Sequence, residues 1–188
     1  QISQKYGKSP AQIVLNWEAG IIIYGPLGVF SGKGPTKDEW NWSVACMKEA
    51  AEHAKTAGVT LVAEFLNRFE IYLLNCAADA AKFAREVGHP NFKMMYDTFH
   101  ANIEEKSSAR SIREAADSII HIHIAESDRG IPGTGQVHWQ ETFEALRAVG
   151  YDGWLVIEAF SRGVPDLATA MRIWRDTSEK IFRASQIL

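Results

Sequence analysis

Five short apolar runs alternate with amphipathic stretches along this chain, and this alternation limits the folds that it can adopt. The runs are too apolar for strands with one solvent-exposed face, which favours a parallel sheet covered on both sides. The stretches between them repeat apolar residues every three or four positions, as helices do. Strands that alternate with helices of this length predict right-handed βαβ units and an α/β fold. The predicted strands cover residues 20–26, 59–65, 92–99, 119–125 and 153–160.

Capping signals bound the predicted helices. The first begins at a Thr36–Glu39 capping box and ends at Gly58, and its face toward the sheet should include Trp40, Val44 and Met47. The second runs from about Cys76 to Val87 with Asn75 as its cap. Apolar residues mark three more helices, near 112–119, 143–149 and 167–182.

Composition narrows the class of protein. A length of 188 residues favours a single domain over residues 1–188. The 20 Lys and Arg against 23 Asp and Glu form no basic block, which argues against nucleic acid or an anionic membrane as the main partner. No apolar run approaches the roughly 18 residues that span a bilayer, and the first residues do not resemble a signal peptide. Cys46 and Cys76 fit neither a metal spacing nor a disulfide framework, so we expect a cytoplasmic protein with free, buried thiols.

Four of the apolar runs carry an ionisable side chain at or near the carboxyl end. The carboxyl ends of parallel strands face one crevice, so these side chains should converge. A buried carboxylate costs several kcal/mol unless it is neutralised, and we expect no matching cluster of buried Lys or Arg nearby. One divalent cation would solve this problem, and oxygen-rich ligation with one histidine favours Mn²⁺, Mg²⁺ or Co²⁺. The residues are Glu64, Asp97, His123 and Glu158.

Further polar residues follow these candidate ligands in the predicted loops, where substrates usually bind. Glu70, His100 and Arg129 are the candidates for substrate contacts. A solvated loop charge is an equal alternative for Arg68 and the preferred interpretation of Glu126 and Asp128. His121 is interpreted as a core histidine or a support for His123 rather than a fifth ligand.

Residues 20 to about 160 resemble the xylose-isomerase-like (βα)8 TIM barrels, specifically the sugar epimerases of the D-tagatose 3-epimerase and D-psicose 3-epimerase type. The strings that carry the resemblance are GVTLVAEFLNRFE (58–70), MMYDTFHANIEE (94–105), IHIHIAESDRGIPGTGQVHW (120–139) and GYDGWLVIEAF (150–160). The resemblance implies a site with one divalent ion, expected to be Mn²⁺. Glu64, Asp97, His123 and Glu158 would bind it, Glu64 and Glu158 would be the catalytic carboxylates, and Glu70, His100 and Arg129 would contact the sugar.

The resemblance also implies a reaction. A carboxylate would remove a proton next to the carbonyl of a small sugar, through a metal-stabilised enediolate, and a second carboxylate would return it. Return to the opposite face gives a ketose epimerase, and return to the adjacent carbon gives an aldose–ketose isomerase. The sequence leaves both outcomes open, because they differ in how the sugar lies and not in the catalytic groups.

The sequence shows five βα units, which match the fourth to eighth of the family's eight. An incomplete barrel has exposed parallel edges, so we expect a homo-oligomer. The alternative is an engineered or fragmentary half-barrel scaffold that is inactive or needs self-assembly. Residues 2–17 weakly resemble a late helix of aldo-keto reductases, which adds a chimera and a reductase to the alternatives. A zinc-dependent repair nuclease is disfavoured because only six histidines and no basic face are present.

Overall fold

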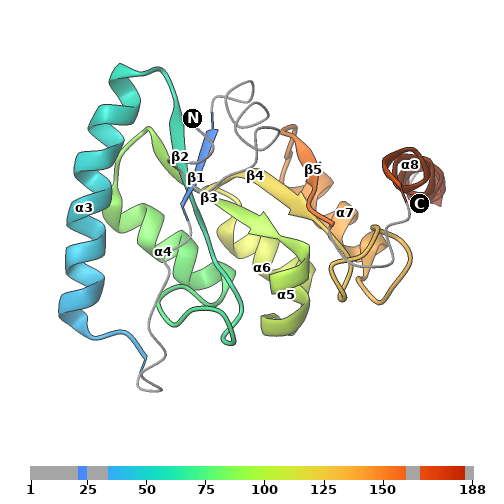
Figure 1. The fold of residues 1–188 in the computed structure, drawn as a ribbon, viewed down its shortest axis with the longest axis horizontal. Helices are drawn as coiled ribbons and strands as arrows, with labels where there is room; N and C mark the ends of the chain where they lie inside the picture. The colour runs from blue at the N-terminus through green and yellow to red at the C-terminus, as the bar shows by residue number, and fades with distance from the viewer. Residues whose placement is uncertain (1–20, 25–33, 160–165, 185–188) are drawn as a thin grey trace.

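The computed structural model describes residues 21–24, 34–159 and 166–184, and these contain a single parallel sheet (Figure 1). Each strand pairs with the next in the sequence, in the order β1-β2-β3-β4-β5. A doubly wound sheet reverses its order part-way, whereas the wall of a TIM barrel does not. The predicted α/β fold with a barrel-type wall is therefore confirmed. The strands are β1 Ile21–Tyr24, β2 Thr60–Glu64, β3 Phe92–Asp97, β4 Ile119–Ile124 and β5 Leu155–Ile157.

The helices follow one another along the outside of this wall (Figure 1). In that order α3 packs against α4, α4 against α6, α6 against α7, and α7 against α8. The predicted helix 112–119 ends earlier, because Ile119 already belongs to β4. The helices are α3 Lys37–Thr56, α4 Ala77–Val87, α5 Thr98–Glu104, α6 Ser108–Ala115, α7 Trp139–Ala148 and α8 Leu167–Ala184.

The main core lies between the sheet and these helices. Phe83 of α4 is fully buried, and its ring makes edge-to-face contacts with Trp40 of α3 at 5.3 Å and Phe92 of β3 at 5.7 Å. Val44 is buried, and Trp40 and Met47 are half-buried against the same cluster. The predicted inner face of α3 is thus correct, although Met47 keeps part of its surface in solvent.

Replacing Phe83 with Ala should lower the free energy of unfolding by about 3 to 5 kcal/mol, because the change leaves a cavity between the rings of Trp40 and Phe92. Urea denaturation measures the loss. Trp42→Ala on α3 is the control, because Trp42 is 67% exposed and its truncation should stay within about 0.5 kcal/mol. Similar losses for the two variants would contradict this account of the core.

Of the two predicted helix N-caps, one is confirmed and the other is wrong. The Thr36–Glu39 capping box is present at the start of α3. Asn75 does not cap α4, whose N-cap is Cys76 without a side-chain cap bond. The Nδ2 group of Asn75 instead donates to the carbonyls of Leu66 and Ile71, both at 2.9 Å. Asn75 therefore ties together the loop that follows β2.

Two further predictions are wrong. The predicted strand 92–99 ends at Asp97, because Asp97 caps α5 and the helix begins at Thr98. Cys46 is exposed on α3, not buried, and Cys76 is half-buried, with burial raising the pKa of its thiol to about 11. Both thiols are free. The aldo-keto reductase-like residues 2–17 lie outside the described residues. No helix within the described ranges is long and apolar enough to cross a membrane.

Candidate active site

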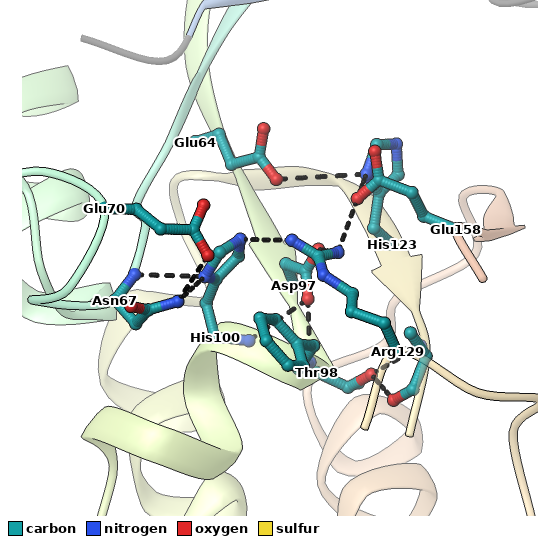
Figure 2. A network of polar contacts seen from close by, with 11 residues as sticks. Glu64, Asn67, Glu70, Asp97, Thr98, His100, His123, Arg129 and Glu158 are labelled. Atoms are coloured by element: carbon teal, nitrogen blue, oxygen red, sulfur yellow. Dashed lines mark hydrogen bonds and ion pairs between the residues drawn. The ribbon is translucent and has the colours of Figure 1, made fainter. Parts of the chain in front are cut away.

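The four predicted ligands come together at the carboxyl ends of the strands (Figure 2). Glu64 and Asp97 end β2 and β3, His123 is the penultimate residue of β4, and Glu158 follows β5 directly. One ligand atom from each residue lies within 4.8 Å of the others. The structure thus contains a cluster that could hold a metal ion, formed by the residues that the sequence singled out.

A local irregularity in the sheet aligns two of these residues. Met94 pairs with Ile119, but Met95 pairs with His121, so the register shifts by one residue. Asp97 is consequently opposite His123. Paired residues of parallel strands point to the same face, and a one-residue slip would send them to opposite faces. The shift therefore places the carboxylate and the imidazole on one side of the sheet.

Asp97 is the most deeply buried of the four. Its side chain is fully buried, and its Oδ1 accepts hydrogen bonds from the backbone N–H groups of Phe99 (2.7 Å) and His100 (3.2 Å). Burial raises the pKa of Asp97 to about 6, although Arg129 and His123 oppose the rise. Burial alone would also raise the pKa of Glu158, but the nearby His123 and Arg129 outweigh it and lower that pKa to about 2.

Arg129 brings a positive charge into this cluster. Its Nη1 lies 3.1 Å from Asp97 Oδ2 and 2.8 Å from Glu158 Oε2. Its guanidinium also stacks on the ring of Phe99, 4.1 Å from the ring centre. The expectation was that no matching cluster of buried Lys or Arg lies nearby, and the site contains one arginine, whose side chain is 16% exposed. One arginine does not balance three carboxylates, so the cluster still carries excess negative charge.

The imidazole of His123 faces the carboxylates. Its Nδ1 is 3.2 Å from Glu158 Oε2 and 4.0 Å from Glu64 Oε1. Neither contact has hydrogen-bond geometry, so Nδ1 is a buried polar atom with no such partner in the described part of the chain. A ring nitrogen that faces carboxylate oxygens in this way is suited to share a cation with them. The donor set therefore fits a divalent ion.

His121 lies beside His123, with the two rings edge to face and 5.2 Å apart. Burial lowers the pKa of His121 to about 4, so its ring is neutral near pH 7. It does not belong to the four-residue cluster, which agrees with its interpretation as a core or supporting residue rather than a fifth ligand.

His100 connects the cluster to the loop after β2. The backbone N–H of Asn67 donates to His100 Nδ1 at 3.0 Å, which leaves the proton of the neutral ring on Nε2. Burial, together with the positive charge of Arg129, lowers the pKa of His100 to about 3, so the neutral form prevails. Nε2 lies 2.7 Å from Nη2 of Arg129. Nε2–H of His100 and Nη2 of Arg129 are therefore both donor groups, and they face each other.

Glu70, the third predicted substrate contact, reaches this network through Asn67. The Nδ2 of Asn67 donates to Glu70 Oε1 at 2.8 Å, and the Glu70 side chain lies beside His100 (Figure 2). The sequence interpretation gave Asn67 and Phe99 no role, although both lie within the quoted strings. Asn67 is buried, which the sequence does not show, and its place three residues before Glu70 was the only available signal.

The three other charged loop residues, Arg68, Glu126 and Asp128, have different surroundings. Asp128 is exposed, as expected, and its Oδ1 accepts from Gly130 N. Arg68 is largely exposed but pairs with Glu104 at 2.7 Å. Glu126 is fully buried, so its interpretation as a solvated charge is wrong. Three donors from the following residues hold its carboxylate.

The chain also matches a known family of proteins. The sequence profile described as "Xylose isomerase-like TIM barrel" matches residues 13–183. The chain belongs to this family. This xylose isomerase-like chain is 45% identical over 146 residues to an L-ribulose 3-epimerase of Mesorhizobium japonicum, covering 77% of the chain and 49% of the relative. It is 42% identical over 142 residues to a D-psicose 3-epimerase of Ruminiclostridium cellulolyticum, covering 76% and 48%.

Solved structures of 3-epimerases also superpose on this fold. An L-ribulose 3-epimerase superposes with a TM-score of 0.68 at 44% identity, over 79% of this xylose isomerase-like chain and 50% of the other. A D-psicose 3-epimerase from Clostridium cellulolyticum, solved with D-tagatose, gives a TM-score of 0.69 at 38% identity, over 84% and 56%. The chain thus spans about half the length of the curated relatives that it matches.

Proposed function

We propose that this chain is a metal-dependent ketose epimerase that inverts the carbon next to the carbonyl of a small sugar. The observation that carries the proposal is the convergence of Glu64, Asp97, His123 and Glu158 within 4.8 Å, in a chain more than 40% identical to ketose 3-epimerases. The names of these relatives favour 3-epimerisation over aldose–ketose isomerisation.

The same four residues would hold the ion, for which we propose Mn²⁺, with Mg²⁺ or Co²⁺ as alternatives. A bound divalent cation supplies Lewis-acid stabilisation of the charge that develops on the carbonyl oxygen. Asp97 would contribute Oδ2, because its Oδ1 is already engaged by two backbone N–H groups.

Glu64 and Glu158 would move the proton. They come from β2 and from the end of β5, and their carboxylates approach His123 from two directions (Figure 2). One carboxylate would accept the proton as the C–H bond at the reacting carbon breaks. The other, starting as the acid, would donate its proton to the opposite face, and the reverse reaction exchanges the two roles.

His100 and Arg129 would bind the sugar oxygens. The Nε2–H of His100 and the Nη2 group of Arg129 are donors that face each other at 2.7 Å. A hydroxyl or carbonyl oxygen placed against both would accept from each of them. Glu70, held by Asn67, would accept from a sugar hydroxyl on the other side of His100. Because a ketose has adjacent oxygens, one molecule can meet all these groups.

The test is incubation of the purified chain with D-psicose, D-tagatose or L-ribulose in D₂O with saturating Mn²⁺. We expect interconversion of the C-3 epimers with deuterium incorporated at C-3, and loss of the reaction in EDTA. Deuterium at C-1 would show aldose–ketose isomerisation instead. A folded chain that binds Mn²⁺ and exchanges no carbon-bound hydrogen would overturn the proposal and favour the scaffold alternative.

We also propose that the chain acts in the cytoplasm as a homo-oligomer. The free thiols of Cys46 and Cys76 suit a reducing compartment. Among the described strands, β1 and β5 each pair with one neighbour only, and such edges favour pairing with another strand.

Sedimentation equilibrium combined with the epimerase assay should therefore show a self-associated species that carries the activity. An open wall would admit water, which competes for the metal and weakens charge stabilisation, so a monomer should be weakly active or inactive. A monomer with an ordinary turnover number, roughly 1 to 10³ per second, would contradict this expectation.

A further inference from the structure

We propose that Glu126 is a positioning residue, which holds the loop between β4 and α7 so that Arg129 reaches the candidate active site. The inference rests on the proposed function, in which Arg129 contacts the sugar. The influence of Glu126 on the guanidinium of Arg129 passes through the backbone between the two residues.

The carboxylate of Glu126 is the centre of a hydrogen-bond cluster. It is fully buried, and it accepts from Gly133 N at 2.6 Å, Val137 N at 3.0 Å and Trp139 Nε1 at 2.5 Å. Hydrogen bonds to an ionised acceptor are stronger than bonds between neutral groups. One side chain therefore fastens the middle of the loop, its end, and the first residue of α7.

The loop is shaped closely around this side chain. A Cβ on Gly135 would lie 2.6 Å from Glu126 Oε2, so only glycine leaves room for the carboxylate at that position. A Cβ on Gly133 would collide with Thr177 of α8, so the loop also rests against the following helix. Trp139 packs against Trp174 of α8, with ring centres 5.4 Å apart. The anchor of the loop is thus closely packed against α8.

The backbone of Glu126 sets the turn that carries Arg129. Glu126 N donates to Gly130 O at 3.1 Å, and Arg129 N donates to Glu126 O at 2.9 Å. Within this turn Arg129 has φ of 61°, and it is the one non-glycine residue with positive φ in the described part of the chain. Such a conformation persists only when the surroundings determine it strongly. The backbone hydrogen bonds of Glu126 to Gly130 and Arg129 stabilise this conformation.

The position of Arg129 matters because its guanidinium meets three groups at once. It contacts Asp97 and Glu158 through Nη1 and His100 through Nη2, at 2.7 to 3.1 Å. A shift of about 1 Å is enough to weaken binding contacts of this kind. Release of the loop should therefore weaken sugar binding while the four candidate ligands, which lie on or beside the strands, stay in place.

The experiment compares Glu126→Gln with two other variants. Glutamine keeps the size of the side chain but offers one acceptor oxygen, and its NH₂ group would face N–H donors. Glu126→Asp keeps the charge. Glu141→Gln is the matched control, because Glu141 Oε1 also joins two elements, accepting from Ser107 Oγ at 2.7 Å and Ala109 N at 3.3 Å, away from Arg129.

We expect Glu126→Gln to raise KM for the ketose at least tenfold, with a smaller change in kcat and a Kd for Mn²⁺ within threefold of wild type. Amide hydrogen exchange at Gly133 and Val137 should become faster. Glu126→Asp should have a KM between those of wild type and Glu126→Gln. Glu141→Gln should have a KM within twofold of wild type. An unchanged KM in Glu126→Gln would overturn the inference, since a merely structural role lowers stability and leaves sugar binding alone.

A second measurement does not depend on turnover. Arg129→Ala should lower Tm more in the wild-type background than in Glu126→Gln, because a released loop no longer holds the arginine contacts. Equal Tm losses in the two backgrounds would overturn the inference. If wild type epimerises no ketose but the Tm losses are unequal, the proposed function fails and the positioning role of Glu126 stands.

Discussion

Glu158→Gln should lower kcat for ketose epimerisation at least 10³-fold and weaken Mn²⁺ binding. Glutamine keeps the size of the side chain, but it removes a negative charge from the cluster and cannot take up a proton. Glu64→Gln should have a similar effect on kcat, because the proposed reaction needs one carboxylate on each face of the sugar. The double variant should lose measurable Mn²⁺ binding, since only Asp97 and His123 then remain. Isothermal titration with Mn²⁺ and the D₂O exchange assay measure the two effects.

Glu105→Gln is the control for these variants. Glu105 is a half-buried carboxylate outside the four-residue cluster, and it accepts from Ala77 N at 2.8 Å. Its replacement should leave both Mn²⁺ affinity and turnover within a few fold of wild type. Unchanged Mn²⁺ binding by the double variant would remove the metal site from the proposal.

Arg129→Ala should destabilise the chain strongly in EDTA and only weakly in Mn²⁺. The arginine faces Asp97 and Glu158, whose side chains are 0% and 20% exposed, and removing one partner of a buried ion pair costs about 3 to 5 kcal/mol. We expect a loss near the lower end of that range, because Glu158 keeps some contact with water. Mn²⁺ would neutralise the same carboxylates, and at 100 times its Kd a ligand adds about 2.7 kcal/mol of stability. Urea denaturation in the two conditions measures the difference.

Arg129→Lys separates charge from geometry in this prediction. Lysine keeps the positive charge but lacks the planar guanidinium that contacts two carboxylates and His100. The stability of Arg129→Lys in EDTA should therefore lie between those of wild type and Arg129→Ala. Sugar binding should fall in both variants. Equal losses of stability in EDTA and in Mn²⁺ would contradict the idea that Arg129 and the metal serve the same two carboxylates.

The four-residue cluster could be predicted from the sequence because it depends on local features. Each of the four residues is a polar side chain at the end of an apolar run, and parallel topology brings those ends together. The end of β3 was misplaced, because Thr98 and Phe99 extend the apolar run and periodicity cannot separate a strand from the first turn of a helix. The cap formed by Asp97 decides between them, and it depends on the direction of a side chain.

Glu126 shows what sequence patterns do not contain. Its donors are the backbone of Gly133 and Val137 and the indole of Trp139, and they approach only when the loop has folded back. A carboxylate beside Asp128 and Arg129 is indistinguishable in sequence from a solvated charge. Asn75 was misassigned for the same reason, since its amide donates to carbonyls on both sides of the loop instead of capping the next helix.

In the proposed site, Asp97 would link the choice of metal to the choice of sugar. One oxygen of its carboxylate caps α5, and the other faces the cluster. The first turn of α5 carries Phe99, which supports Arg129, and His100, which faces the proposed substrate. A cation of different radius would change the position of Asp97. Because Asp97 also caps α5, that movement would shift His100 and, through Phe99, Arg129, the two side chains proposed to face the sugar. Exchange of Mn²⁺ for Mg²⁺ or Co²⁺ should consequently alter the ranking of ketoses and not only the overall rate.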